Sequence, residues 1–225
     1  MERNGNMTKM TKTNTIFTGS LKRGEVGEEI FIASLAGSKA VKKVYDARRS
    51  AKYQDADVDF IIDVHQKSML SELTGSNRVS VELKTDYTTY QNIYYEKSSC
   101  YELHTAGCME KTQSDVLIYY YIRKNIFYVL NTETFRNWVH EHSEDFIKNF
   151  KEERGRFGIY HKEGLLIPTS SIEAACENKQ IIGKKVQVTD AFSKQRVANL
   201  DACYYHKIEM LHDTRKIRNA FDAME

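Results

Sequence analysis

Three closely spaced apolar runs between residues 57 and 96 constrain the fold more than any other part of the sequence. The first run begins with Asp59, the second contains Glu82 and Lys84, and Glu96 ends the third. Side chains two residues apart on a strand share a face, so Glu82 and Lys84 should project together while their apolar neighbours enter a core. We therefore expect neighbouring strands that bring two carboxylates and one ammonium group to the same place.

The chain as a whole is typical of one globular domain that carries an appendage. Of its 225 residues, 41% are hydrophobic and 28% are charged, values that argue against a disordered chain. Helical and strand segments alternate in the order expected of an α/β protein with a central mixed sheet flanked by helices. We expect a flexible tail over residues 1–20, a core over 21–170 and a C-terminal extension over 171–225 that packs on the core.

The individual elements follow from hydrophobic spacing and from end signals. Gly37 should close the first helix, Thr132 or Thr134 should cap the second, and Ser170 or Ser171 should cap the third. The predicted helices cover residues 22–37, 132–150, 172–178 and 205–224. The predicted strands cover 60–64, 79–84, 89–96, 164–168 and 185–189, with a hairpin over 116–131 and a strand leading into a charged turn over 39–53. A turn over 66–77, a loop or short helix over 97–114 and a charged loop over 151–158 connect them.

A local cluster of basic residues is the main indication of a nucleic-acid partner. The net charge is only +2, so affinity for nucleic acid must come from such a patch rather than from a global excess of charge. Residues 39–53 contain six bases and one acid. A solvated strand face would explain this run, whereas its position just before the Asp59 run favours contacts with phosphates. The candidate phosphate-binding residues are Lys39, Lys42, Lys43, Arg48, Arg49 and Lys52.

Cysteine usage and the lengths of the apolar runs bear on the compartment and on partners. The four cysteines occur without an apolar leader, so we expect free thiols in a reducing, cytoplasmic environment. No apolar run approaches the roughly 18 residues of a membrane span, so no membrane partner is expected. Gly24 and Gly27 do not follow a strand, and so no nucleotide cofactor is expected either.

The grouping of Asp59, Glu82 and Lys84 is suited to a hard divalent metal ion. Mg²⁺ prefers oxygen ligands, and one Asp, one Glu and a backbone carbonyl suffice when a substrate phosphate completes the shell. Asp59 and Glu82 are the proposed ligands. Lys84 would hold or help to deprotonate the attacking water and would neutralise the charge that builds on the phosphate. The chemistry that this pattern predicts is phosphodiester hydrolysis.

The first predicted helix carries three carboxylates that need a separate interpretation. Glu25, Glu28 and Glu29 lie in its first turns, where the helix dipole favours negative charge. Glu28 differs from the other two because Ile32 and Leu35 follow it at helical spacing. The pattern therefore predicts that Glu28 points inward.

These motifs together resemble those of the PD-(D/E)xK nuclease superfamily. The resemblance lies in an acidic helix, an Asp on the next sheet element, and the Val-x-Glu-Leu-Lys segment that ends at Lys84. Residues Thr89–Glu96 resemble a strand of the Holliday-junction-resolvase-like and phage-type branches, and Gly107 with Ser114–Tyr121 is similar to a later strand of those branches. The resemblance spans about residues 22–170 and implies a restriction-endonuclease-like core.

The resemblance implies a role for each site residue. Glu28, Asp59, Glu82 and Lys84 would be catalytic, and Asp59, Glu82 and Glu96 would hold Mg²⁺, for which Mn²⁺ would substitute. The superfamily's Pro-Asp is absent, because Ala56–Phe60 stands in its place, so Asp57 remains the alternative to Asp59. Glu25 or Glu29 could likewise replace Glu28.

The implied activity is that of a magnesium-dependent deoxyribonuclease. It would be an endonuclease that hydrolyses DNA, selective for structure or context, and active as a homodimer. A restriction-type sequence-specific endonuclease is one alternative, with residues 171–225 as its specificity or dimerisation element. A non-catalytic nucleic-acid-binding module on the same fold is the other.

Two further patterns have simpler explanations. Cys100, His104 and Cys108 recur at every fourth residue and would align on a helix, but a structural zinc site needs a fourth ligand, so free thiols are favoured. The chain contains 14 tyrosines, many of them between Tyr90 and Tyr121. Strand packing explains most of these, and one or two could stack on unpaired bases.

Overall fold

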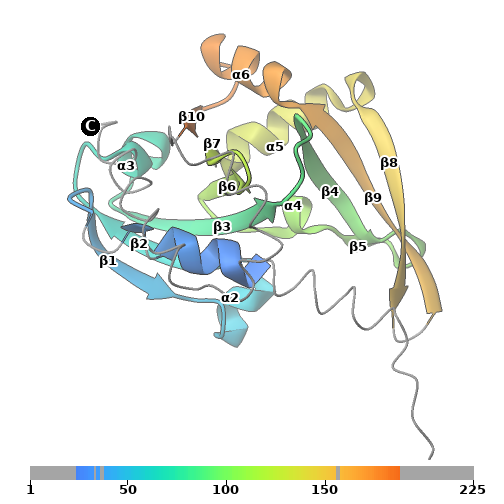
Figure 1. Cartoon of the computed structure of the whole chain (residues 1–225), viewed down its shortest axis with the longest axis horizontal. Helices are drawn as coiled ribbons and strands as arrows, with labels where there is room; N and C mark the ends of the chain where they lie inside the picture. The colour runs from blue at the N-terminus through green and yellow to red at the C-terminus, as the bar shows by residue number, and fades with distance from the viewer. Residues whose placement is uncertain (1–23, 33, 36–37, 156–157, 188–225) are drawn as a thin grey trace, which may run out of the picture.

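The computed structural model describes residues 24–32, 34–35, 38–155 and 158–187, and it shows a mixed α/β protein built on two sheets (Figure 1). The predicted tail over residues 1–20 and the predicted helix over 205–224 lie outside the described residues. The C-terminal extension is described only as far as residue 187.

The larger sheet has six strands in the order β1-β2-β3-β6-β7-β10. Its β3 and β6 are parallel, and every other neighbouring pair is antiparallel, so the sheet is mixed as predicted. The strands are β1 (Val41–Asp46), β2 (Phe60–Val64), β3 (Arg78–Asp86), β6 (Val116–Tyr121), β7 (Ile126–Asn131) and β10 (Gly183–Gln187).

The smaller sheet has four antiparallel strands in the order β5-β4-β9-β8 and lies at the right in Figure 1. Its strands are β4 (Asn92–Cys100), β5 (Thr105–Ala106), β8 (Ile147–Gly155) and β9 (Gly158–Pro168). The third apolar run of the sequence, which ends at Glu96, therefore belongs to a different sheet from the first two.

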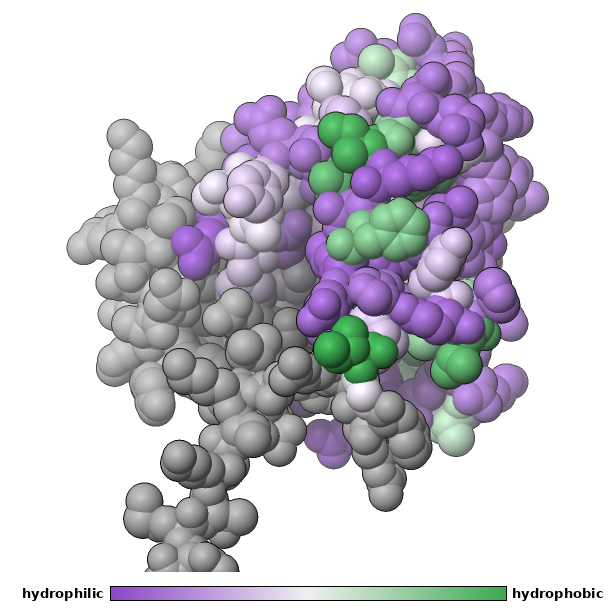
Figure 2. All heavy atoms as spheres, turned by 90° about the vertical axis from the view of Figure 1, so that its right-hand side faces the viewer, coloured by the Kyte–Doolittle hydropathy of each residue, from purple (hydrophilic) through white to green (hydrophobic). Residues whose placement is uncertain are grey.

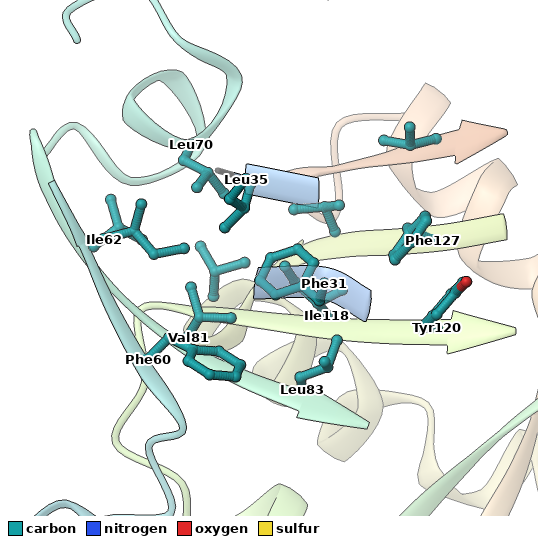
Figure 3. Packing of buried hydrophobic residues seen from close by; sticks show 14 of the residues in the cluster. Phe31, Leu35, Phe60, Ile62, Leu70, Val81, Leu83, Ile118, Tyr120 and Phe127 are labelled. Carbon is teal, nitrogen blue, oxygen red and sulfur yellow. The ribbon is translucent and has the colours of Figure 1, made fainter. Parts of the chain in front are cut away.

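Helices and the smaller sheet cover the two faces of the larger sheet. The amino-terminal helix, residues 24–32 and 34–35, packs on one face, where Phe31 lies 5.9 Å from Phe60 and 6.4 Å from Phe127 between ring centroids (Figure 3). A second core fills the other face with residues of β4, β9, α5 (Thr132–Glu141) and α6 (Thr169–Glu177). Because both faces are covered, all six residues of β6 are buried, which explains its continuous apolar run.

Shorter helices connect the strands. They are α2 (Ala51–Asp55), α3 (Met69–Thr74) and α4 (Cys108–Lys111), with single 3₁₀ turns η1 (Tyr101–Leu103) and η2 (Ser143–Asp145). The prediction of a plain turn over residues 66–77 was wrong, because α3 occupies it. Ser68 accepts a hydrogen bond from the Ser71 amide at its start, and Gly75 ends it in the left-handed conformation at φ 70°.

Several other boundaries differ from the predictions. The helix predicted over 132–150 ends at Glu141, and its cap is Asn131, whose side chain accepts from the Thr134 amide. Neither predicted serine caps α6, which begins directly after Pro168. The charged loop predicted over 151–158 is in fact part of the β8–β9 hairpin, whose polar residues pair across its two strands. The strand predicted over 89–96 begins at Asn92 and continues to Cys100.

The surface beside the β8–β9 hairpin alternates between hydrophobic and hydrophilic residues (Figure 2). Ile147, Phe150 and Ile159 of the hairpin are each more than half exposed. In Figure 2 the hydrophobic groups are separated by hydrophilic ones, as on a solvated face. Within the described part of the chain, no helix is both long enough and apolar enough to cross a membrane.

Candidate active site

The site begins where β2 and β3 separate. Their ladder ends at the pair Phe60 and Val81, and β3 then continues with β6 as its partner on the other edge. At this fork the Asp59 amide donates to the Val81 carbonyl at 2.9 Å, and Asp59 Oδ2 accepts from the Leu83 amide at 2.8 Å. The Asp59 carboxylate thus satisfies a β3 backbone group that β2 no longer reaches, and this fixes its position beside β3.

Glu82 and Lys84 project from β3 on the face opposite to the buried Val81 and Leu83. Lys84 Nζ lies 2.6 Å from Glu82 Oε1, and the two side chains are 35% and 5% exposed respectively. The carboxylate is therefore inside the protein, while the lysine side chain is partly accessible to solvent. This is the arrangement that the spacing of the two residues predicted.

Burial disfavours the ionised form of both carboxyl groups of the site. Desolvation raises the pKa of Glu82 to about 8, and the Asp59 charge adds to the effect while the Lys84 ammonium opposes it. Burial also raises the pKa of Asp59, against the lowering effect of the Leu83 amide and of Lys84. Two neighbouring carboxylates that resist ionisation need further positive charge before both can ionise.

Glu28 is the helix carboxylate that faces this site. Its Oε2 lies 2.7 Å from Arg48 Nη1, and its side chain is 19% exposed. Burial is the main cause of its raised pKa, and the charge of Asp59 contributes, whereas Glu25 and Glu29 are exposed. Of the three carboxylates in the first turns, Glu28 is therefore the one that interacts electrostatically with Asp59.

A close approach of the helix to β3 makes this placement possible. A Cβ atom on Gly27 would overlap the side chain of Thr85, the residue after Lys84 on β3. Only glycine allows the helix to lie at this distance. The glycine next to Glu28 is thus part of how the carboxylate reaches the site.

We expect Gly27→Ala to destabilise the protein by about 1–3 kcal/mol, because the new methyl group must displace the helix or Thr85. Urea denaturation measures the change in the free energy of unfolding. Gly24→Ala is the matched control, since its Cβ would meet Glu28 Oε1 at an ordinary 3.8 Å. Equal free energies of unfolding for the two variants would contradict the close approach.

Arg48, one of the predicted phosphate-binding residues, has carboxylate partners within the protein. Besides Glu28, it binds Asp46, with Nη2 2.6 Å from Oδ2, so its charge is already balanced by carboxylates. Little in the sequence indicated this role, because Arg48 was one base in a basic run. The other five predicted phosphate-binding residues, Lys39, Lys42, Lys43, Arg49 and Lys52, are exposed on and around β1 and α2.

Asp57 lies near the site but is held differently from Asp59. Its φ is 45°, and its Oδ1 lies 3.4 Å from Lys111 Nζ. Its charge contributes to the raised pKa of Glu82, so it is close enough to act on the site electrostatically. Asp59, which is anchored to the backbone of β3, is the better candidate for a metal ligand.

Glu96 is not brought together with Asp59 and Glu82. Its Oε1 accepts from the Cys108 amide at 3.3 Å, and its Oε2 lies 3.5 Å from Lys162 Nζ on the smaller sheet. Among the described residues there is no group of three or more His, Cys, Asp or Glu that could hold a metal. Two carboxylates, rather than the three predicted ligands, therefore form the site.

The alternating cysteines and histidine do not lie on one helix. Cys100 ends β4, His104 follows η1 in a left-handed conformation, and Cys108 begins α4. The three cysteines within the described ranges, Cys100, Cys108 and Cys176, are free thiols. Burial raises the pKa of Cys108 to about 11, which makes this thiol a poor nucleophile at neutral pH.

Asp59 and Glu82 fit the needs of a Mg²⁺ ion. Such an ion is bound by one or two carboxylates and completes its shell with water and substrate phosphate. The pKa of each carboxyl group is raised mainly by burial, which disfavours the ionised form. A divalent cation would favour the ionised form of both groups.

Comparison with protein-family models, with curated proteins and with solved structures finds no match to this chain. A functional assignment therefore depends on the geometry of the site.

Proposed function

We propose that this protein is a metal-dependent endonuclease that hydrolyses phosphodiester bonds in DNA. The observation that carries the proposal is the buried Glu82 carboxylate, 2.6 Å from Lys84 Nζ and beside Asp59 at the fork between β2 and β3. Two carboxylates and an ammonium group at such a fork between strands can bind a divalent ion, a water molecule and a phosphate together.

The proposed fold is a restriction-endonuclease-like core. The order of its parts supports this: the helix with Glu28, the Asp59 element and the strand with Glu82 and Lys84 follow one another in the chain and meet at one point. The mixed sheet flanked by helices is compatible with such a core.

Each side chain of the site has a proposed task. A Mg²⁺ or Mn²⁺ ion held by Asp59 and Glu82 would polarise the scissile phosphate and lower the pKa of the attacking water. Lys84 has three donors, and Glu82 uses one of them, so the others can hold that water and offset charge on the phosphate oxygens. Glu28 binds Arg48 and so keeps a guanidinium group beside the site, which makes Glu28 a positioning residue.

The test is a cleavage assay on supercoiled, linear, single-stranded and four-way-junction DNA with Mg²⁺ or Mn²⁺. We expect cleavage that EDTA and Asp59→Asn each abolish. Asp145→Asn, on an exposed carboxylate in η2, is the matched control and should cleave normally. Cleavage that survives both EDTA and Asp59→Asn would refute the mechanism, and DNA binding without any cleavage would indicate a non-catalytic module.

The exposed basic residues around β1 are the proposed phosphate contacts. Replacing Lys42, Lys43, Arg49 and Lys52 with Ala should weaken DNA binding. The slope of log K against log salt concentration should become less steep by about 0.9 for each phosphate contact with duplex DNA that is lost. Titrations from low to physiological salt measure this slope. An unchanged slope would show that DNA binds to a different surface. Lys148→Ala, on the smaller sheet, serves as the control.

The homodimer that the resemblance implies also stays a proposal. Size-exclusion chromatography with light scattering tests it directly, with and without DNA. A monomer that still cuts both strands would show that one copy of the site acts twice.

A further inference from the structure

A cavity of about 230 Å³ lies away from the carboxylates, at the carboxyl end of β6. The loop before β4, the β6–β7 turn, the start of α6 and β10 form its walls. The residues that define its chemistry are Tyr90, Tyr121, Lys124, Tyr128, Glu173 and Lys185.

Three tyrosine side chains line the cavity, and one of them is exposed to solvent. Tyr121 and Tyr128, which line the cavity, are buried, whereas the Tyr90 side chain is 71% exposed. Lys124 Nζ lies 3.4 Å from the Tyr90 carbonyl oxygen and so ties the loop to the β6–β7 turn. A tyrosine that is exposed beside a cavity offers a ring face to a ligand.

The charged residues that line the cavity are two lysines and one glutamate, Lys124, Lys185 and Glu173. Glu173 accepts from Tyr128 Oη at 2.6 Å and lies 3.0 Å from Lys185 Nζ, so these two charges balance each other. Lys124 Nζ lies 5.6 Å from the Tyr121 ring centroid, and it forms no ion pair with any described residue. Among the described residues no carboxylate neutralises its ammonium group, which can therefore attract an anionic ligand.

Aromatic faces beside a lysine suit a planar ligand that carries a phosphate. Bases stack on aromatic side chains regardless of sequence, and Lys binds the neighbouring phosphate. The cavity is smaller than the roughly 300–1,000 Å³ of typical drug-sized ligand pockets, so it suits one base rather than a dinucleotide cofactor.

We propose that this cavity binds one unpaired nucleotide of the nucleic-acid substrate, with the base against Tyr90 and the phosphate at Lys124. This inference rests on the proposed nuclease function and narrows its substrate class to nucleic acid with an unpaired nucleotide near the cut.

Strand β3 relates the active site to the cavity. Glu82, Lys84 and Asp86 project on one face, and Asp86 lies opposite Tyr121 in the ladder of β3 and β6. At about 3.3 Å per residue, Asp86 is roughly 13 Å beyond Glu82. A strand of nucleic acid that follows β3 would place the phosphate to be cut at Glu82 and a nearby base at the cavity.

Fluorescence anisotropy in EDTA tests the cavity without cleavage. The probes are a labelled single-stranded oligonucleotide and a blunt duplex, with deoxynucleoside monophosphates as competitors. Tyr90→Ala should weaken single-strand binding about 5- to 100-fold, Lys124→Ala should weaken it and lower its salt dependence, and both should leave duplex binding unchanged. Tyr101→Ala and Lys148→Ala, at exposed positions by the smaller sheet, are the matched controls.

Each outcome decides between the two proposals. The cavity proposal would be refuted if Tyr90→Ala and Tyr101→Ala weakened binding equally. It would also be refuted if Tyr90→Ala weakened single-strand and duplex binding by the same factor. Tyr90-dependent binding of the monophosphates without single-strand binding would assign the cavity to a free nucleotide and overturn the substrate assignment. Tyr90-dependent single-strand binding by a protein that never cleaves would keep the cavity and refute the nuclease. If the protein cleaves substrates with unpaired nucleotides and Tyr90→Ala does not affect this cleavage, the nuclease proposal is kept and the cavity proposal is refuted.

Discussion

Replacing Glu82 with Gln is expected to abolish DNA cleavage and, at alkaline pH, to stabilise the metal-free protein. The loss of activity follows because Gln cannot supply the charged ligand that a divalent ion requires. The gain in stability follows because a buried charge is removed. Glu82 is 5% exposed, and its raised pKa of about 8 shows that folding disfavours its ionised form.

The pH dependence of this gain has a definite sign. The ordinary pKa of the Glu82 carboxyl group is 4.5, so between pH 4.5 and about 8 the folded protein holds a proton that the unfolded chain has lost. The contribution of Glu82 to the free energy of unfolding therefore falls as pH rises through this window, and the Glu82→Gln variant lacks this fall. The full pKa difference corresponds to roughly 5 kcal/mol. We expect about 1–3 kcal/mol at pH 9, because loss of the carboxylate also leaves Lys84 without its partner.

Urea denaturation of both proteins in EDTA, at pH 5 and at pH 9, measures this effect. Glu141→Gln, at an exposed position on α5, is the control and should show no pH-dependent difference. A stability difference between the Glu82→Gln variant and the original protein that is the same at both pH values would show that Glu82 ionises normally.

The part of the site on β3 could be predicted from the sequence because strand geometry is simple. Alternation alone places Glu82 and Lys84 on one face, and the apolar residues that alternate with them, Val81 and Leu83, require a buried strand. The structure has both features, with the two side chains 2.6 Å apart. No long-range information is needed for a contact between residues two apart.

The choice of Asp59 and Glu28 needed contacts that the sequence does not contain. Asp57 and Asp59 precede the same strand, and only the hydrogen bond to the Leu83 amide shows which carboxylate is fixed at β3. In the same way, three glutamates share the first turns of one helix. The packing of Gly27 on Thr85 decides which of them faces inward.

The smaller sheet shows why the C-terminal half was harder to predict. The β8–β9 hairpin is rich in charged residues and resembles a loop in sequence, yet residues 147–155 pair with residues 158–166 in a regular antiparallel ladder. Its stability comes from pairing with β4, which lies far earlier in the chain. Local spacing contains no information about such a partner. Glu96 lies on β4 of this smaller sheet. It was expected at the metal site because the local sequence does not show that its strand belongs to a different sheet from β2 and β3.

Replacing Lys84 with Ala is expected to reduce cleavage about 100- to 10,000-fold and to move metal binding to higher pH. The first effect follows from the loss of the group that holds the attacking water and offsets charge on the phosphate. The second follows because Lys84 lowers the pKa of Glu82, so its removal raises that pKa above about 8. Metal binding needs ionised carboxylates, and so Mn²⁺ or Mg²⁺ should bind the variant only at more alkaline pH.

Isothermal titration with Mn²⁺ between about pH 6.5 and pH 9.5 separates these two effects, because metal affinity is measured without DNA. Lys162→Ala is the matched control, since Lys162 also lies beside a carboxylate, Glu96, but on the smaller sheet. Lys84→Arg keeps the positive charge, so it should restore the original pH dependence of metal binding even where cleavage stays slow. If Lys84→Ala lowered cleavage without changing that pH dependence, the lysine would act on the substrate alone, and the coupling between Lys84 and Glu82 would have no part in metal binding.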